Sequence, residues 1–149
     1  MRIYVDADAC PVKEVIVEVA QEYKIPVTMV CSLSHYSTNT YETVEYIFVD
    51  NIPQAADMAI INRIKPGDII ITQDYGLASL VLKKGVIPLH HTGKRYTNEN
   101  IDQLLLKRHI SAKIRRGGGK TPGPKAFTKE DKARFRQSLI KAVLESKQE

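Results

Sequence analysis

The chain alternates short runs of β-branched residues with segments of helical periodicity, and this alternation limits the folds open to it. Valine, isoleucine and threonine dominate the short runs, whereas apolar residues in the intervening segments recur every three or four positions. Such alternation is typical of βαβ units, which build a mostly parallel sheet covered by helices. We expect strands at residues 2–5, 27–31, 44–49, 69–72 and 86–89. We expect helices at residues 11–23, 53–65, 77–84, 97–109 and 128–144.

The length of 149 residues suits one hydrophobic core. The stretch at residues 113–127 reads KIRRGGGKTPGPKAF, which is too polar and too rich in glycine and proline to fold alone. After it, Thr128 and Asp131 have the spacing of a capping box for the last helix. The expected organisation is therefore an α/β domain at residues 1–112, followed at 113–149 by a basic loop and a C-terminal helix.

Positive charge is concentrated in the C-terminal third of the chain. Eleven of the 22 Lys and Arg residues but two of the 17 Asp and Glu residues lie between 107 and 136, so this stretch carries +9 and the remainder −4. Lys and Arg gain affinity for nucleic acids by releasing counterions from phosphates. The pattern fits a nucleic-acid partner, RNA in particular, or a merely solvated tail. The candidate nucleic-acid-binding residues are Arg115, Arg116, Lys120 and Lys125.

The sequence has no feature typical of export or membrane insertion. No segment approaches the roughly 20 consecutive apolar residues of a membrane span, and the charged N-terminal segment is unlike a signal peptide. The two cysteines, Cys10 and Cys31, are too few for a disulfide framework and lack the spacing of zinc ligands. We expect a cytoplasmic protein with reduced thiols and no membrane partner.

Four acidic residues lie where the predicted fold would bring them together. Asp6 and Asp8 come directly after the first strand, and Asp74 follows the strand in GDIIITQD. The carboxyl ends of neighbouring parallel strands meet at one edge of a sheet, where ligands bind. Asp57 lies on the apolar, sheet-facing stripe of its predicted helix. An acid in that position indicates a function.

Such a group of carboxylates favours a metal site. Grouped acids raise one another's pKa and burial adds to the penalty, so a divalent cation stabilises them. Oxygen ligands suit Mg²⁺ or Mn²⁺, which can activate water against a phosphodiester. The predicted metal-binding and catalytic residues are Asp6, Asp8, Asp57 and Asp74.

Each acid also has a purely structural explanation. Asp8 and Asp74 could cap the helices that follow them, which is the commoner role of an isolated Asp at a helix start. Asp57 could pair with Arg63 or Lys65. These alternatives remain open at the level of sequence.

Four segments resemble those of the YaiI/YqxD family of bacterial proteins, a branch of the PIN-like nuclease superfamily. They read VDADACPVK, the AAD of QAADMAI, GDIIITQDYGLA and RRGGGKTPGPKAF, and they occur in the expected order over nearly the whole chain. The resemblance implies a PIN-like three-layer α/β/α sandwich with a central, mostly parallel sheet. It also implies an acidic centre for Mg²⁺ or Mn²⁺, as in the members that cut RNA.

The resemblance also assigns the acids one by one. Asp6 matches the acid that ends the first strand, Asp57 the acid on the middle helix, and Asp74 the acid after the strand that reads IIIT. Asp8 matches the Asp-x-Asp of this branch rather than the general PIN pattern. The resulting interpretation is a metal-dependent nuclease that hydrolyses phosphodiester bonds, with RNA as the expected substrate.

Two other functions compete with the nuclease. One is a non-catalytic RNA- or ribosome-binding protein that grips its partner with the basic tail. The other is a phosphatase with Asp-x-Asp after its first strand, which needs a further acid at the same edge. Asp68 and Asp74 bracket one strand, so they should lie about 20 Å apart at opposite edges. Asp68 is therefore predicted to be a turn residue.

Overall fold

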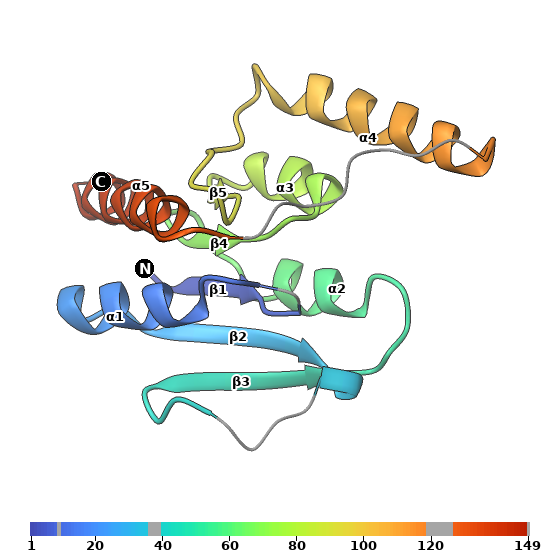
Figure 1. Ribbon diagram of the computed structural model, residues 1–149. Helices are drawn as coiled ribbons and strands as arrows, with labels where there is room; N and C mark the ends of the chain where they lie inside the picture. Colours follow the sequence, from blue (N-terminus) through green and yellow to red (C-terminus); the bar gives the residue numbers. More distant parts are fainter. Residues whose placement is uncertain (9, 36–39, 119–126, 149) are drawn as a thin grey trace.

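One sheet of parallel strands organises the computed structural model, which describes residues 1–8, 10–35, 40–118 and 127–148 (Figure 1). The strands are β1 (Ile3–Asp6), β2 (Val27–Ser32), β3 (Val44–Val49), β4 (Ile69–Ile71) and β5 (Ile87–Leu89). The α-helices are α1 (Lys13–Tyr23), α2 (Ala55–Ile61), α3 (Tyr75–Leu82), α4 (Ile101–Arg116) and α5 (Lys129–Lys147). A short 3-10 helix, η1 (Leu33–His35), follows β2.

The strand order is β3-β2-β1-β4-β5, and every pairing is parallel. The chain adds β2 and β3 on one side of β1 and then crosses over to place β4 and β5 on the other side. The strand order therefore reverses between β1 and β4. In open α/β sheets, ligands bind at the carboxyl ends of the strands beside such a reversal.

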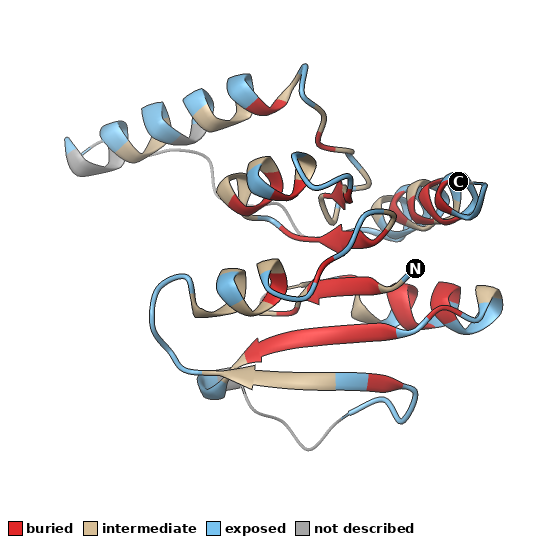
Figure 2. Ribbon diagram, turned by 180° about the vertical axis from the view of Figure 1, so that it is seen from behind, coloured by how far each residue is buried: buried red, intermediate tan, exposed pale blue. Residues whose placement is uncertain are grey.

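Helices cover both faces of the sheet, which confirms the predicted three-layer α/β/α sandwich. Successive residues of β1 point to opposite faces: Ile3 and Val5 join a core with α1 and α5, whereas Tyr4 joins a core with α2 and α3. Because both faces are covered, the central strands are buried over nearly their whole length, as the red ribbons of β1, β2 and β4 in Figure 2 show.

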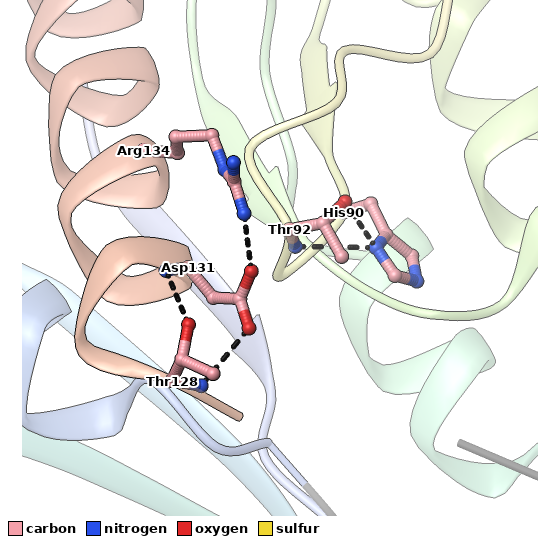
Figure 3. A network of polar contacts seen from close by, with 5 residues as sticks. All are labelled: His90, Thr92, Thr128, Asp131 and Arg134. Carbon is pink, nitrogen blue, oxygen red and sulfur yellow. Dashed lines mark hydrogen bonds and ion pairs between the residues drawn. The ribbon is translucent and has the colours of Figure 1, made fainter. Parts of the chain in front are cut away.

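The C-terminal helix α5 belongs to the main core. It packs against α1 and buries Phe135, Leu139 and Val143 with residues of the sheet. The predicted capping box at its start is confirmed: the Thr128 hydroxyl oxygen accepts from the Asp131 N–H at 3.1 Å, and the Asp131 carboxylate accepts from the Thr128 N–H at 2.9 Å (Figure 3). Residues 129–147 are thus part of the fold.

Helix α4 ends later than the sequence analysis predicted. It runs to Arg116 instead of about residue 109, because Ala112, Lys113 and Arg115 are good helix formers and the first helix breaker is Gly117. Residues 113–116 of the expected basic loop therefore form its last turn, and residues 119–126 lie outside the described residues. α4 packs on α3 through a small core around Tyr96.

Several helix starts also differ from the prediction: α3 begins at Tyr75 instead of Leu77, and α4 begins at Ile101 instead of Thr97. α1 begins at Lys13 instead of Pro11, and α2 begins at Ala55 instead of Pro53 because Gln54 takes a left-handed conformation with φ of 68°. The part of the chain that the structure describes also contains no helix that is long and apolar enough to cross a bilayer.

Candidate functional site

A cleft of about 930 Å³ opens at the carboxyl edge of the sheet, beside the reversal of strand order. Its walls come from the ends of β2 and β3, the segment leading into α2, α2 itself, and one side of α3. Three of the four predicted acids, Asp8, Asp57 and Asp74, line it. None of the described residues that line it is Lys or Arg, so we call it the acidic cleft.

The fourth acid, Asp6, ends β1 and is largely buried. Its pKa is raised to about 6, chiefly by burial. The hydrogen bond from Thr72 lowers this pKa, and the charges of Asp57, Asp8 and Asp74 raise it. Because all three other acids act on Asp6, the fold brings the four predicted residues into one electrostatic group. This grouping joins residues that are up to 68 positions apart in the chain, from Asp6 to Asp74.

Asp8 connects the turn after β1 to the end of β2. Both of its carboxylate oxygens accept from the Ser32 backbone N–H, at 3.2 Å each. The capping alternative for Asp8 is wrong, since α1 has Val12 at its N-cap position and no side-chain cap. Asp8 therefore joins neighbouring strand ends at the mouth of the acidic cleft.

Asp74 caps α3, as the structural alternative predicted. Its Oδ1 accepts from the Leu77 N–H at 3.1 Å, and its backbone is extended, as an N-cap requires. The cap fixes this carboxylate at the start of α3, where it also lines the acidic cleft.

Asp57 lies in the first turn of α2 and faces the acidic cleft. Ile60 and Ile64, one and two turns further on, are buried in the core under the sheet. Asp57 is on the same side but nearer the strand ends, so its side chain is partly exposed in the cleft instead of covered by the sheet. Arg63 is one of the two pairing partners that the sequence analysis considered for Asp57, and its guanidinium donates to the Ala59 carbonyl oxygen.

Thr72 connects the acids, and the sequence analysis did not identify it. This buried residue follows β4; its hydroxyl donates to Asp6 Oδ2 at 3.1 Å and accepts from the Asp74 N–H at 3.0 Å. Its carbonyl oxygen accepts from the hydroxyl of the buried Tyr96 at 3.0 Å. Thr72 therefore orients Asp6 and Asp74 together, and Tyr96 holds Thr72. The only sequence signal was a polar residue between a buried strand and a helix-capping Asp.

Two histidines follow β5 at the same edge of the sheet. Their rings lie with centroids 4.0 Å apart and planes tilted by 35°. His90 Nδ1 accepts from the Thr92 N–H at 3.2 Å (Figure 3). Burial lowers the pKa of both, that of His90 to about 4. Both rings are therefore uncharged at neutral pH and do not add positive charge to this edge.

The predicted nucleic-acid-binding residues lie at the end of α4 and beyond it. Arg115 and Arg116 form its last turn, but the described part of the chain does not include their side chains. Lys120 and Lys125 lie outside the described residues altogether. The position of these cations relative to the acidic cleft stays a prediction.

The carboxylates approach one another without forming a tight cluster. Among residues 1–8, 10–35, 40–118 and 127–148, no three His, Cys, Asp or Glu side chains are grouped closely enough to hold a metal ion by themselves. The acids do share one donor type, carboxylate oxygen, which suits hard cations such as Mg²⁺ and Mn²⁺.

Asp68, which a phosphatase of the Asp-x-Asp type would need at this site, lies elsewhere. It precedes β4 at the amino edge of the sheet, and its carboxylate accepts from the backbone N–H groups of Arg2 at 2.9 Å and Lys65 at 2.8 Å. The prediction that Asp68 is a turn residue is confirmed. Asp68 is therefore not among the described acids at the carboxyl edge, where the phosphatase would need it.

Comparison with known proteins finds relatives that match nearly the whole chain. The chain is 57% identical to a UPF0178 protein of Bacillus cereus over 145 residues, which cover 97% of this chain and 99% of the relative. It is 53% identical to a UPF0178 protein of Enterococcus faecalis over 147 residues, which cover 98% and 99%. No solved structure matches the chain. The profile of the "Uncharacterized BCR, YaiI/YqxD family" matches residues 4–145, and the chain therefore belongs to the YaiI/YqxD family.

Proposed function

We propose that the chain is a metal-dependent nuclease of the PIN-like type, which binds Mg²⁺ or Mn²⁺ at the acidic cleft and hydrolyses phosphodiester bonds in RNA. The observation that carries this proposal is the convergence of Asp6, Asp8, Asp57 and Asp74 beside the reversal of strand order. The raised pKa of Asp6 reflects burial and like-charge repulsion. A divalent cation bound here would offset both effects.

The donor set fits Mg²⁺ or Mn²⁺. Mg²⁺ keeps several of its waters and is often bound through one or two carboxylates together with substrate phosphates. A cleft whose acids approach one another without a direct three-ligand cluster suits such a hydrated ion. A bound ion of this kind would lower the pKa of a water molecule and stabilise charge on the transferring phosphorus.

The proposal gives the four acids different tasks. Asp6, Asp57 and Asp74 would hold the ion, and Asp8 would be a fourth ligand or orient the attacking water. Thr72 fixes the direction of the Asp6 carboxylate, and the cap of α3 fixes Asp74. The basic residues Arg115, Arg116, Lys120 and Lys125 would contact the RNA backbone.

Calorimetric titration of Mn²⁺ and Mg²⁺ into the protein tests the site without knowledge of the substrate. The informative variant is Asp6→Asn/Asp74→Asn, because Asn keeps the size of each side chain and caps a helix as well as Asp does. Asp102→Asn, an exposed change in α4, is the matched control. We expect binding to the wild type and the control but not to the double variant.

The titration is repeated with RNA present, because substrate phosphate can complete the shell of a weakly held ion. Cleavage of labelled single-stranded and structured RNA with Mn²⁺ then tests the reaction. Metal binding that survives in the double variant would show that the acids are not the ligands. Absence of binding with and without RNA would refute the metal-dependent function.

A second function, RNA binding without cleavage, is favoured by one observation, the concentration of 11 Lys and Arg residues between residues 107 and 136. It requires the basic residues but not the acids. RNA affinity that is equal in the wild type and in Asp6→Asn/Asp74→Asn, with no metal dependence, would identify it.

A further inference from the structure

Helix α4 has an exposed apolar stripe. Leu106 is 59% exposed, Ile110 49% and Ile114 44%, and their spacing of four residues places them in one row along the helix. Lys107 and Lys113 are exposed on either side of this row. From residue 103 to residue 116 the sequence has five Lys and Arg residues and no Asp or Glu. We call the row of Leu106, Ile110 and Ile114 the α4 stripe.

The α4 stripe lies on the side of the helix opposite the residues that pack on α3, so among the described residues it points away from the fold. The opposite face of the helix, with Ile101, Leu104 and Leu105, packs on α3. Nine residues, or two and a half turns, separate Ile101 from Ile110, so these side chains lie on opposite sides of the helix. α4 lies outside α3 and its C-terminal half extends past it (Figure 1). A helix with apolar residues on two opposite faces has a second surface to bury.

The sequence of the neighbouring segment does not supply this cover. Residues 119–126 read GKTPGPKA and contain no large apolar side chain. The stripe also cannot enter the acidic cleft of its own chain, because that cleft is bordered by α3, from which the stripe points away. The complementary surface therefore belongs to another molecule.

The acidic cleft offers the complementary chemistry. Ile52, Met58 and Leu80 line it and are 63%, 55% and 48% exposed, and exposed apolar side chains that gather at one place mark interaction sites. Together with the α4 stripe, these residues are six of the ten exposed large apolar side chains among the described residues. The cleft also carries four carboxylates, Asp8, Asp50, Asp57 and Asp74. The acidic cleft thus combines exposed apolar side chains with carboxylates, and the α4 stripe combines exposed apolar side chains with lysines.

We propose that two copies of this chain form a symmetric dimer in which each places α4 in the acidic cleft of the other. The α4 stripe contacts Ile52, Met58 and Leu80, and Lys107 and Lys113 lie beside the carboxylates. Amphipathic helices bind apolar grooves through anchors one turn apart, as in this row. Two-fold symmetry forms the contact twice, which doubles its area, and closes the assembly. Like-charged α4 helices would repel each other if they paired directly.

Sedimentation velocity over a wide range of protein concentration tests the dimer. Ile110→Asp changes the stripe, Met58→Asp changes the cleft wall, and Leu144→Asp changes an equally exposed (46%) residue on α5 as the control. All three positions are exposed, so circular dichroism and melting should match the wild type. We expect each of the first two variants to raise the dimer dissociation constant at least about tenfold, and the control to leave it unchanged.

An equimolar mixture of Ile110→Asp and Met58→Asp tests which surfaces meet. The mixed pair keeps one wild-type α4 facing one wild-type cleft, so dimers should reappear that neither variant forms alone. Added salt should weaken the wild-type dimer, since lysines meet carboxylates.

Three results would overturn the proposal. The first is a wild type that is monomeric at every concentration, whether or not it binds vesicles of anionic lipid through the stripe. The second is a Met58→Asp variant with the wild-type dissociation constant, which would indicate direct α4 pairing. The third is a mixture that stays monomeric. In this dimer each α4 occupies the cleft that the proposed nuclease function assigns to the ion and RNA, so the dimer is a closed state of that site. Sedimentation without metal or RNA measures the dimer alone, so failure of the dimer and failure of the proposed nuclease function give different results.

Discussion

Replacement of Asp6 by asparagine should stabilise the protein at neutral pH. The pKa of Asp6 rises from an ordinary 3.8 to about 6 in the folded chain, chiefly through burial and then through the neighbouring carboxylates. An acid with a raised folded pKa binds more protons in the folded state, so its ionisation lowers stability as the pH rises from about 4 to about 6. The shift corresponds to at most about 3 kcal/mol at neutral pH.

Asp6→Asn removes this penalty and keeps an oxygen that can accept from Thr72. In urea unfolding at a series of pH values, the variant should equal the wild type near pH 4 and exceed it by up to about 3 kcal/mol at neutral pH. The melting temperature should rise by up to about 6 to 12 °C. Asp102→Asn, an exposed change in α4, should stay within about 0.5 kcal/mol at every pH.

A variant that is no more stable than the wild type at neutral pH would refute this reasoning, because it would mean that burial and the neighbouring carboxylates do not disfavour the charged form of Asp6. Mg²⁺ provides a second readout. At a concentration about 100 times its dissociation constant, a bound ion stabilises the folded state by about 2.7 kcal/mol. Mg²⁺ should therefore stabilise the wild type more than Asp6→Asn. The difference between their free energies of unfolding should become smaller when Mg²⁺ is added.

Two further predictions concern different parts of the protein: the Thr72 hydroxyl, which bonds to Asp6 and Asp74, and the basic residues at the end of α4 and beyond it. Thr72→Val should cost about 1 to 3 kcal/mol in urea unfolding, since the Asp74 N–H loses its acceptor, and it should raise the Asp6 pKa further; Thr72→Ser should retain both properties. Wild-type stability in Thr72→Val would contradict that role. The second variant changes four predicted RNA contacts to Gln: Arg115, Arg116, Lys120 and Lys125. The slope of log affinity for single-stranded RNA against log salt concentration, measured by fluorescence anisotropy, should become less steep by about 3. An unchanged slope would exclude these residues as RNA contacts.

The sequence predicted the sheet and the strand-end acids because both depend on local pattern. β-branched runs separated by helical segments defined the five strands, and parallel strands bring Asp6 and Asp74 to one edge. Thr72 was not predicted, because its role depends on contacts with Asp6 and Tyr96, which are 66 and 24 residues away. Patterns in a sequence relate residues a few positions apart, so they do not reveal contacts between residues this far apart.

The end of α4 was mispredicted for a different reason. The sequence analysis treated the cationic residues after His109 as part of a loop, although lysine and arginine are good helix formers and Gly117 is the first residue that disfavours a helix. The extra turns carry Ile110 and Ile114, and therefore the α4 stripe. The helix boundary thus decided whether an interaction surface could be recognised from sequence.

The two explanations of Asp74, helix cap and metal ligand, are compatible. A carboxylate has two oxygens with about four lone-pair sites, and the bond from the Leu77 N–H uses one site on Oδ1. The cap orders the side chain at the mouth of the cleft, so less conformational entropy remains to be lost when a cation binds. Asparagine caps equally well but is uncharged and is a poorer ligand. Asp74→Asn should therefore separate the two roles: the stability of α3 should be retained, whereas affinity for Mn²⁺ should fall.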